Sequence, residues 1–252
     1  MCLQTAILSD IHGNLVALKA VLSDIERKKV KRFVCLGDVA ANGPQPREVI
    51  ELLRNAKCPC VMGNTDEALA KNLPEEFGEE LTEDRMRMEE LDAWTRKQLT
   101  TSHRSYLSTF RPIITLRSRN GPIFQFYHGS PRSNIEGISI TTPDDEVASR
   151  LEGRRADLFA GGHTHAQMFR RFRASVSLNP GSVGLPFEKD SSGKIRNPTR
   201  AEYALASFAE QALNVELLSI PYHLSDLRTA VRNSGMPAPD WWLSDWYAPA
   251  LR

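Results

Sequence analysis

Near the start of the chain, three short apolar runs each end beside a polar residue, and helical segments separate them. The runs are residues 5–8, 33–36 and 60–62. Asn14, a favoured helix N-cap, precedes the first helical segment, and Pro46, which suits the first turn of a helix, begins the second. Strands that alternate with helices and are apolar on both faces are typical of a parallel sheet. The pattern therefore predicts βαβ units, whose ligands gather beyond the carboxyl ends of the strands.

The second half of the chain differs, because beyond Pro112 short apolar runs crowd together and helical signals become rare. These runs span residues 113–116, 123–127, 158–160, 176–178, 203–208 and 215–220. A parallel half followed by several short strands predicts an α/β fold in which two facing mixed sheets lie between helices, a four-layer α/β/β/α sandwich. Residues 190–198, which are rich in turn formers, are expected to form a flexible loop.

The length and the apolar content favour one domain over residues 1–252, because 252 residues with 41% hydrophobic content can bury one large core. Residues 68–110 are charged and helical in pattern, and we interpret them as an insertion, either a lid over a site or a helical flank. The tryptophan-rich tail is expected to pack on the chain's own core or to form a subunit contact. The oligomeric state stays open.

Charge and hydropathy exclude several classes of partner. Lys and Arg number 32 against 31 Asp and Glu, so no global field draws the protein to nucleic acid in bulk. The run Arg170, Arg171 and Arg173 could touch a phosphate, but we interpret it as a solvated face without a role. No signal peptide or apolar run of about 20 residues stands out, which argues against a membrane partner. The cysteine pattern offers no Cys-x-x-Cys motif, and we expect a reduced, cytoplasmic compartment.

Polar side chains suited to metal binding follow the three early runs. Asp10, Asp38 and Asn64 each come just after a run, and His12 points the same way as Asp10 because alternate residues of an extended chain do. A glycine before Asp38 and before Asn64 lets the backbone approach a bound ion closely. Together these residues place three oxygen ligands and one nitrogen ligand along one edge of a sheet.

Three further histidines stand in glycine-rich turns after apolar runs, namely His128, His163 and His165. Neutral imidazole is the commonest nitrogen ligand of metals, and a His-x-His pair on a flexible turn is a stronger indication than a lone histidine. The candidate metal ligands are therefore Asp10, His12, Asp38, Asn64, His128, His163 and His165.

In this order, the motifs Asp-x-His, Gly-Asp, Gly-Asn, His-Gly and Gly-His-Thr-His resemble the signature of the calcineurin-like metallophosphoesterases. Asp-Ile-His-Gly-Asn, Asn-Thr-Asp and Asn-Pro-Gly-Ser-Val-Gly-Leu-Pro further resemble the small bacterial and archaeal phosphodiesterase branch, over roughly residues 7–219. The resemblance implies that Asp10, His12 and His165 hold one metal, that Asn64, His128 and His163 hold the other, and that Asp38 bridges them. Two divalent ions about 3.5–4 Å apart can share a hydroxide that attacks the phosphorus. We assign Asp38, Asn64 and His128 to catalysis as well.

The chemistry of the predicted ligands constrains the metal and the substrate. A mixed imidazole and oxygen set favours Mn, Fe, Zn, Co or Ni over Ca or Mg. Two carboxylates leave two divalent ions with two excess positive charges, which a hydroxide and a phosphodiester monoanion would cancel. A small phosphodiester is therefore the expected substrate. The residues that bind it are not evident from the sequence.

Thr65 departs from the family pattern, because many members have a histidine after the Gly-Asn that can protonate the leaving oxygen. Threonine cannot act as an acid near neutral pH, so we expect activated aryl esters to react faster than alkyl esters. Asp66 and His103 are possible substitutes, but a helix-cap carboxylate and a surface histidine are the simpler interpretations.

Other functions stay open beside the phosphodiesterase. The family also resembles phosphomonoesterases, including protein phosphatases, and diadenosine-polyphosphate hydrolases. A member of the same fold is a non-catalytic scaffold that has lost part of its metal set. All seven candidate ligands are present here, which favours an enzyme over a scaffold.

Overall fold

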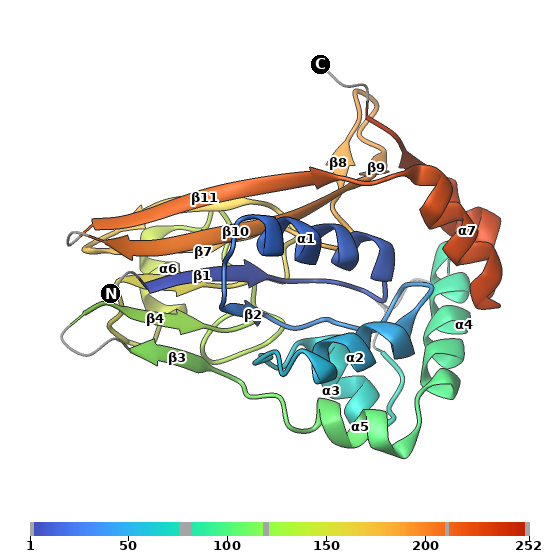
Figure 1. Ribbon diagram of the computed structural model, residues 1–252, viewed down its shortest axis with the longest axis horizontal. Helices are drawn as coiled ribbons and strands as arrows, with labels where there is room; N and C mark the ends of the chain where they lie inside the picture. The colour runs from blue at the N-terminus through green and yellow to red at the C-terminus, as the bar shows by residue number, and fades with distance from the viewer. Residues whose placement is uncertain (1–2, 76–81, 118–120, 210–211, 250–252) are drawn as a thin grey trace.

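The computed structural model describes residues 3–75, 82–117, 121–209 and 212–249. Four strands form the first sheet, in the order β11-β10-β1-β2 (Figure 1). They are β1 (Leu3–Leu8), β2 (Phe33–Cys35), β10 (Arg200–Ala209) and β11 (Ala212–Pro221). β1 pairs in parallel with β2 but antiparallel with β10, so the sheet is mixed.

Five strands form the second sheet, in the order β3-β4-β5-β7-β6. They are β3 (Ile114–Arg117), β4 (Ile123–Phe126), β5 (Leu158–Ala160), β6 (Met168–Phe172) and β7 (Ser175–Asn179). The three central strands β4, β5 and β7 run parallel, and each edge strand is antiparallel to its neighbour. This sheet is mixed as well.

Successive apolar side chains along a strand point to opposite faces of its sheet, so each sheet packs on both sides. Ile7 and Ala204 of the first sheet pack against Phe126 of the second, which forms the core between the sheets. Leu8 points to the opposite face, which is covered by α1 (Leu15–Arg27) and α2 (Pro46–Asn55). Phe159 lies on the outer face of the second sheet beneath α6 (Asp144–Arg150). The predicted four-layer α/β/β/α sandwich is therefore confirmed.

The remaining helices gather at one end of the molecule (Figure 1). They are α3 (Asn64–Lys71), α4 (Glu83–Gln98), α5 (Thr101–Leu107), α7 (Leu224–Ser234) and α8 (Pro239–Leu243). Leu91 of α4 packs with Leu227 of α7 and with Trp242 and Trp246 of the tail, so the expected packing of the tail on its own core is confirmed. This contact favours a flank over a lid for α4. Residues 76–81, the centre of the acidic stretch, lie outside the described residues.

Two predicted elements differ in the structure. Residues 60–62 form only isolated bridges, in which Cys60 pairs with Cys35 and Val61 with Arg111, because Pro59 has no N–H to extend the ladder. Residues 190–198, predicted as a flexible loop, contain β9 (Ile195–Pro198), which pairs with β8 (Glu188–Lys189) and with β12 (Trp246–Tyr247). The tail thus supplies a partner that a local pattern cannot reveal.

Arg170 also departs from expectation. Its guanidinium is half-buried and bonds to the carbonyl of Thr142 and to the carboxylate of Asp144, so it does not belong to a solvated face. Among the described helices, none is long and apolar enough to cross a membrane; α4, with 16 residues, is the longest and is highly charged.

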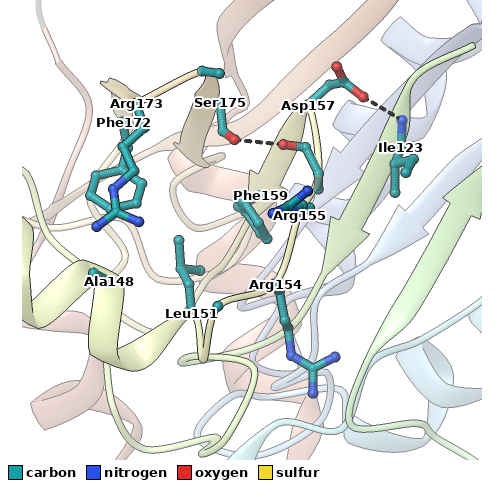
Figure 2. Close-up of a pocket in the computed structure, with 13 residues that line it drawn as sticks. Ile123, Ala148, Leu151, Arg154, Arg155, Asp157, Phe159, Phe172, Arg173 and Ser175 are labelled. Carbon is teal, nitrogen blue, oxygen red and sulfur yellow. Dashed lines mark hydrogen bonds between the residues drawn. The ribbon is translucent and has the colours of Figure 1, made fainter.

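Candidate metal ligands lie at one end of the second sheet and a pocket lies at the other. The carboxyl ends of β4 and β5 lead to His128 and His163. At the amino ends of β5 and β7, a pocket opens beside α6 (Figure 2).

Candidate metal centre

The candidate ligands come from loops that follow strands of both sheets. Asp10 and Asp38 follow β1 and β2, while His128 and His163 follow β4 and β5. The loops bond to one another, since Asp10 N–H donates to the carbonyl of Gly37 (3.0 Å) and Gly162 N–H to that of His128 (2.7 Å). His163 N–H donates across the two sheets to Asp10 Oδ2 (3.1 Å). The structure thus brings residues far apart in sequence to one shared edge.

Five of the seven candidates have left-handed backbone conformations. The φ angles are 54° for Asp10, 46° for His12, 54° for Asp38, 67° for His163 and 54° for His165. Glycine adopts this conformation at no steric cost, whereas other residues lose about 1–3 kcal/mol each. Retaining a side chain at five such positions indicates that the side chains themselves are needed.

Glycines allow these loops to approach closely. A Cβ on Gly63 would lie 2.1 Å from Asp38 Oδ1, and one on Gly162 would lie 2.8 Å from Asp10 Oδ2 and still closer to Ser9 Oγ. Both contacts are shorter than atoms tolerate. The glycines directly before Asn64 and His163 are therefore required by the close packing of the loops around the carboxylates.

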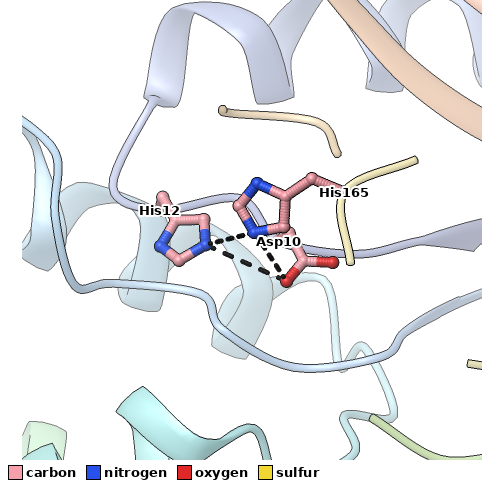
Figure 3. A group of neighbouring side chains, drawn as sticks. All are labelled: Asp10, His12 and His165. Carbon is pink, nitrogen blue, oxygen red and sulfur yellow. Dashed lines mark hydrogen bonds and ion pairs between the residues drawn. The ribbon is translucent and has the colours of Figure 1, made fainter. Parts of the chain in front are cut away.

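Asp10, His12 and His165 form the first group (Figure 3). The two Nε2 atoms lie 3.1 Å apart, and those of His165 and His12 lie 3.3 and 3.9 Å from Asp10 Oδ1. His12 Nδ1 donates to the carbonyl of Ala41 (3.2 Å) and His165 Nδ1 to that of Leu185 (2.8 Å). Both Nδ1 atoms are thus engaged as donors, which leaves the two Nε2 atoms facing each other as potential metal ligands. Burial lowers the pKa of His165, but the charge of Asp10 and further contacts together raise it, so a proton and a metal ion would compete for this Nε2.

The surroundings of Asp10 Oδ1 show whether a cation would suit this group. The atom is buried and accepts no hydrogen bond from the described residues, and His165 Nε2 lies 3.3 Å from it. A buried carboxylate oxygen without a partner is costly. A divalent cation would accept all three donors at once, so the group suits a metal.

Asp38, His128 and His163 form the second group, and Asn64 adjoins it. His128 Nε2 lies 3.2 Å from Asn64 Oδ1 and 3.4 Å from Asp38 Oδ2, while its Nδ1 donates to the carbonyl of Leu36 (2.8 Å). The rings of His128 and His163 are 5.1 Å apart. Here too, oxygen and nitrogen atoms that could bind a metal converge.

Asp38 lies between the two groups. Its Oδ2 is 3.4 Å from His128 Nε2 and 4.0 Å from His12 Nε2, while its Oδ1 accepts the N–H of Thr65 (3.1 Å). One oxygen is therefore fixed by the backbone and the other faces both groups. This is the geometry that a bridging ligand needs.

Burial and charge divide the histidines by pKa. Burial, and next the adjacent His165, lower the pKa of His12 to about 4, so this ring is neutral at pH 7. For His128, burial acts in the same direction, but the charges of Asp38 and Asp10 and the hydrogen bonds to Asp38 and Leu36 together outweigh it and raise the pKa to about 10. A proton and a metal ion would compete for the Nε2 of His128.

The side chain of Asp66, which is not one of the seven candidate ligands, holds the loop that carries Asp38. Asp66 accepts the N–H groups of Asp38 (2.7 Å), Val39 (3.0 Å) and Gly63 (3.3 Å). Burial, and next Asp38, raise the pKa of Asp66 to about 7, yet both of its oxygens already accept N–H groups. The helix-cap interpretation of Asp66 is therefore confirmed.

His103, the other possible acid, is not a surface residue as predicted. It is buried, its Nδ1 accepts the N–H of Thr100 and its Nε2 lies 2.9 Å from Glu51 on α2. Contact between α5 and α2 explains its burial. Its partners are those of a helix cap, and the prediction of a surface histidine is wrong.

The turn after β7 supports the histidine loop from behind. Asn179 Nδ2 donates to the carbonyl of Gly162 (2.7 Å) and to Thr164 Oγ1 (3.0 Å), and Ser182 Oγ donates to the carbonyl of Asp10 (2.7 Å). The turn therefore borders the candidate site and supports it by hydrogen bonds to its backbone.

Two residues near the centre were not singled out from the sequence. The ring of Phe187 is 6.0 Å from that of His165 and is 40% exposed. Glu75 accepts a long hydrogen bond from Asn42 Nδ2 (3.4 Å), and burial, followed by Asp38, raises its pKa to about 7. Both lie in segments that lack an apolar period, so no local signal marks them.

Comparison with known proteins agrees with this geometry. The family model of the calcineurin-like phosphoesterase superfamily domain matches residues 3–197. The protein MJ0912 of Methanocaldococcus jannaschii is 27% identical over 250 residues, which cover 95% of each chain.

Solved structures are similar over nearly the whole chain. A metallophosphoesterase from Sphaerobacter thermophilus has a TM-score of 0.70 and 27% identity, covering 96% of this chain and 97% of that one. The protein PH1004 of Pyrococcus horikoshii has a TM-score of 0.74 and 20% identity, covering 93% and 94%, which is a likeness of fold. The family match spans most of the sequence and confirms the resemblance of its motifs: this chain belongs to the calcineurin-like phosphoesterase superfamily.

Proposed function

We propose that the seven side chains hold two divalent transition-metal ions and that the protein hydrolyses small phosphodiesters. Asp10, His12 and His165 would hold one ion, Asn64, His128 and His163 the other, and Asp38 would contact both. The observation that carries this proposal is the pair of Nε2 atoms of His12 and His165, 3.1 Å apart, beside a buried carboxylate oxygen without a hydrogen bond.

The two ions, when bound, would lower the pKa of a water molecule and neutralise charge on the phosphate. The chain contributes the orientation of the ligands. Carbonyls of Ala41, Leu36 and Leu185 fix the tautomers of His12, His128 and His165, and backbone N–H groups fix one oxygen each of Asp10 and Asp38. Rigid ligands keep the site from rearranging as charge develops during the reaction.

The charge of the site favours a diester. Among the seven side chains only Asp10 and Asp38 are anionic, so two divalent ions keep two excess positive charges, which hydroxide and a phosphodiester monoanion balance. The exposed ring of Phe187 beside His165 adds an apolar surface for a flat ester group. We therefore propose a substrate with an aromatic or heterocyclic ester group.

The test compares a diester and a monoester on metal-loaded protein. Purified protein is stripped with chelator and reloaded with Mn, Fe, Zn, Co or Ni, and bound metal is counted by mass spectrometry. We expect two ions per chain and a higher kcat/KM for bis(4-nitrophenyl) phosphate than for 4-nitrophenyl phosphate. The reverse preference would indicate a phosphomonoesterase, and a metal-loaded protein without any esterase activity would indicate a scaffold.

Asp38→Asn separates the metal mechanism from contaminating activity. Loss of a metal ligand should lower kcat/KM more than about a hundredfold and reduce the amount of bound metal. Even the removal of an outer-shell partner lowers metal affinity or activity about 10–100-fold. Asp144→Asn, which removes a carboxylate on the distant α6, is the matched control and should leave activity unchanged. An Asp38→Asn protein that keeps both ions and full activity contradicts the assignment.

A further inference from the structure

A pocket of about 490 Å3 lies at the amino ends of β5 and β7 (Figure 2). Leu151, Phe159 and Phe172 form its apolar wall, and Arg154, Arg155 and Arg173 stand around it. We call it the arginine pocket. Its volume lies in the range of roughly 300–1,000 Å3 that small-molecule sites occupy.

The arginine pocket is separate from the metal centre. Asp157, just before β5, lines the pocket, whereas the carboxyl end of β5 leads to His163, and none of the seven candidate metal ligands lines the pocket. The two features therefore lie at opposite ends of the same strand. A ligand in the pocket would not displace a ligand of the metal centre.

The pocket carries an excess of positive charge. Asp157 is the one acidic residue that lines it, and its Oδ2 accepts the N–H of Ile123 (2.8 Å). Arg154 has Glu152 as a partner at 3.6 Å, whereas Arg155 and Arg173 have no carboxylate partner within the described parts of the chain. Two guanidinium groups are thus free to bind an anion.

Arg173 occupies a costly position in the backbone. It lies in the two-residue turn between β6 and β7, since Phe172 pairs with Ser175. Its φ is 54°, a conformation for which Asn or Gly is preferred in such turns. Its guanidinium carbon lies 5.1 Å from the centre of the Phe172 ring, at the wall of the pocket. An arginine kept there places a cation where the turn alone favours a smaller residue.

We propose that the arginine pocket binds a small organic anion with a flat apolar part, such as a nucleoside monophosphate. A single guanidinium binds two phosphate oxygens through parallel N–H bonds, and Arg155 and Arg173 each present one to the pocket. Leu151, Phe159 and Phe172 line the pocket and are 2%, 2% and 6% exposed, so they form a small apolar floor against which the edge of a ring can rest. The arginine run that we interpreted as a solvated face thereby has one member, Arg173, in a binding site.

Calorimetric titration of the metal-loaded protein tests this. The probe is the phosphonate analogue of adenosine monophosphate, which phosphoesterases do not hydrolyse. Methylphosphonate and adenosine, titrated separately, represent its anionic and its flat half. We expect saturable binding of the probe that is tighter than that of either half. Binding of methylphosphonate as tight as that of the probe would overturn the role of the apolar wall.

Variants locate the site. Arg155→Ala and Arg173→Ala should each weaken probe binding about tenfold, the loss typical of a charge-assisted hydrogen bond. Arg171→Ala, an exposed neighbour that does not line the pocket, is the matched control and should bind like the original protein. Binding must survive in His163→Ala, which disrupts the metal centre. The proposal is wrong if binding is lost in His163→Ala, if both pocket variants bind normally, or if the probe does not bind at all.

Discussion

The carboxylate of Asp66 accepts the backbone N–H of Asp38 at 2.7 Å, so a helix-cap residue holds the residue that faces both groups of candidate ligands. The same carboxylate accepts the N–H groups of Val39 and Gly63. It therefore joins the loop after β2 to the start of α3. Asp66 positions a predicted ligand without being one.

Asp66→Asn should weaken metal binding about 10–100-fold, the usual cost of removing an outer-shell partner. Asparagine presents one acceptor where aspartate presents two, and its NH2 group would face an N–H donor. Competition with a chelator measures the affinity. Glu67→Gln is the control on the same helix, because Glu67 bonds to Lys71 and Asn134 at the surface. Unchanged affinity in Asp66→Asn would contradict the positioning role.

The leaving group should govern the rate, because Thr65 cannot act as an acid near neutral pH and both Asp66 and His103 are engaged as caps. In a series of aryl methyl phosphates, kcat should fall steeply as the pKa of the phenol rises. Glu75 accepts a hydrogen bond from Asn42. The substitution Glu75→Gln should not change this slope. A shallow slope that steepens in Glu75→Gln would instead identify Glu75 as the proton donor.

Local sequence patterns are enough to place the candidate ligands at strand ends, since an apolar run followed by Asp10 or His163 needs no knowledge of distant contacts. They fail where a partner is remote. β9 pairs with the tail, which lies about fifty residues further along the chain, and His103 is buried by α2. The left-handed φ angles of the ligands and the three bonds to Asp66 also arise only when loops from both sheets meet. These backbone conformations and hydrogen bonds therefore depend on tertiary contacts between the loops, which local sequence patterns do not reveal.

Phe187 should contribute to the binding of aromatic esters. An aromatic pair is worth about 0.5–1.5 kcal/mol, so Phe187→Ala should raise KM for bis(4-nitrophenyl) phosphate roughly two- to tenfold. The inhibition constant of dimethyl phosphate, which has no ring, should stay the same. Phe169→Ala removes a comparably exposed phenylalanine from β6 and serves as the control. Equal losses for both ligands would show that Phe187 acts through His165 rather than on the substrate.

Acid stability should depend on the buried contact between α1 and β10, in which Tyr203 OH donates to Asp24 Oδ2 (2.6 Å). Burial alone would raise the pKa of Asp24, but the hydrogen bonds from Tyr203 and Arg27 outweigh it and hold the pKa below its ordinary value of 3.8. The folded state therefore releases this proton more readily than the unfolded state. The stabilisation is complete above pH 3.8 and is lost as pH falls through the lowered pKa.

Tyr203→Phe should thus lower the free energy of unfolding by about 1.5–3 kcal/mol near pH 7, the value of a hydrogen bond to a charged group. The difference from the original protein should shrink below about pH 4, because a protonated Asp24 gains less from Tyr203. Urea unfolding of both proteins across this range, in the same metal state, measures it. Asp24→Asn should show the same flattened dependence on acid. A difference that is constant with pH would mean that Tyr203 stabilises the fold by packing alone, without the charge of Asp24.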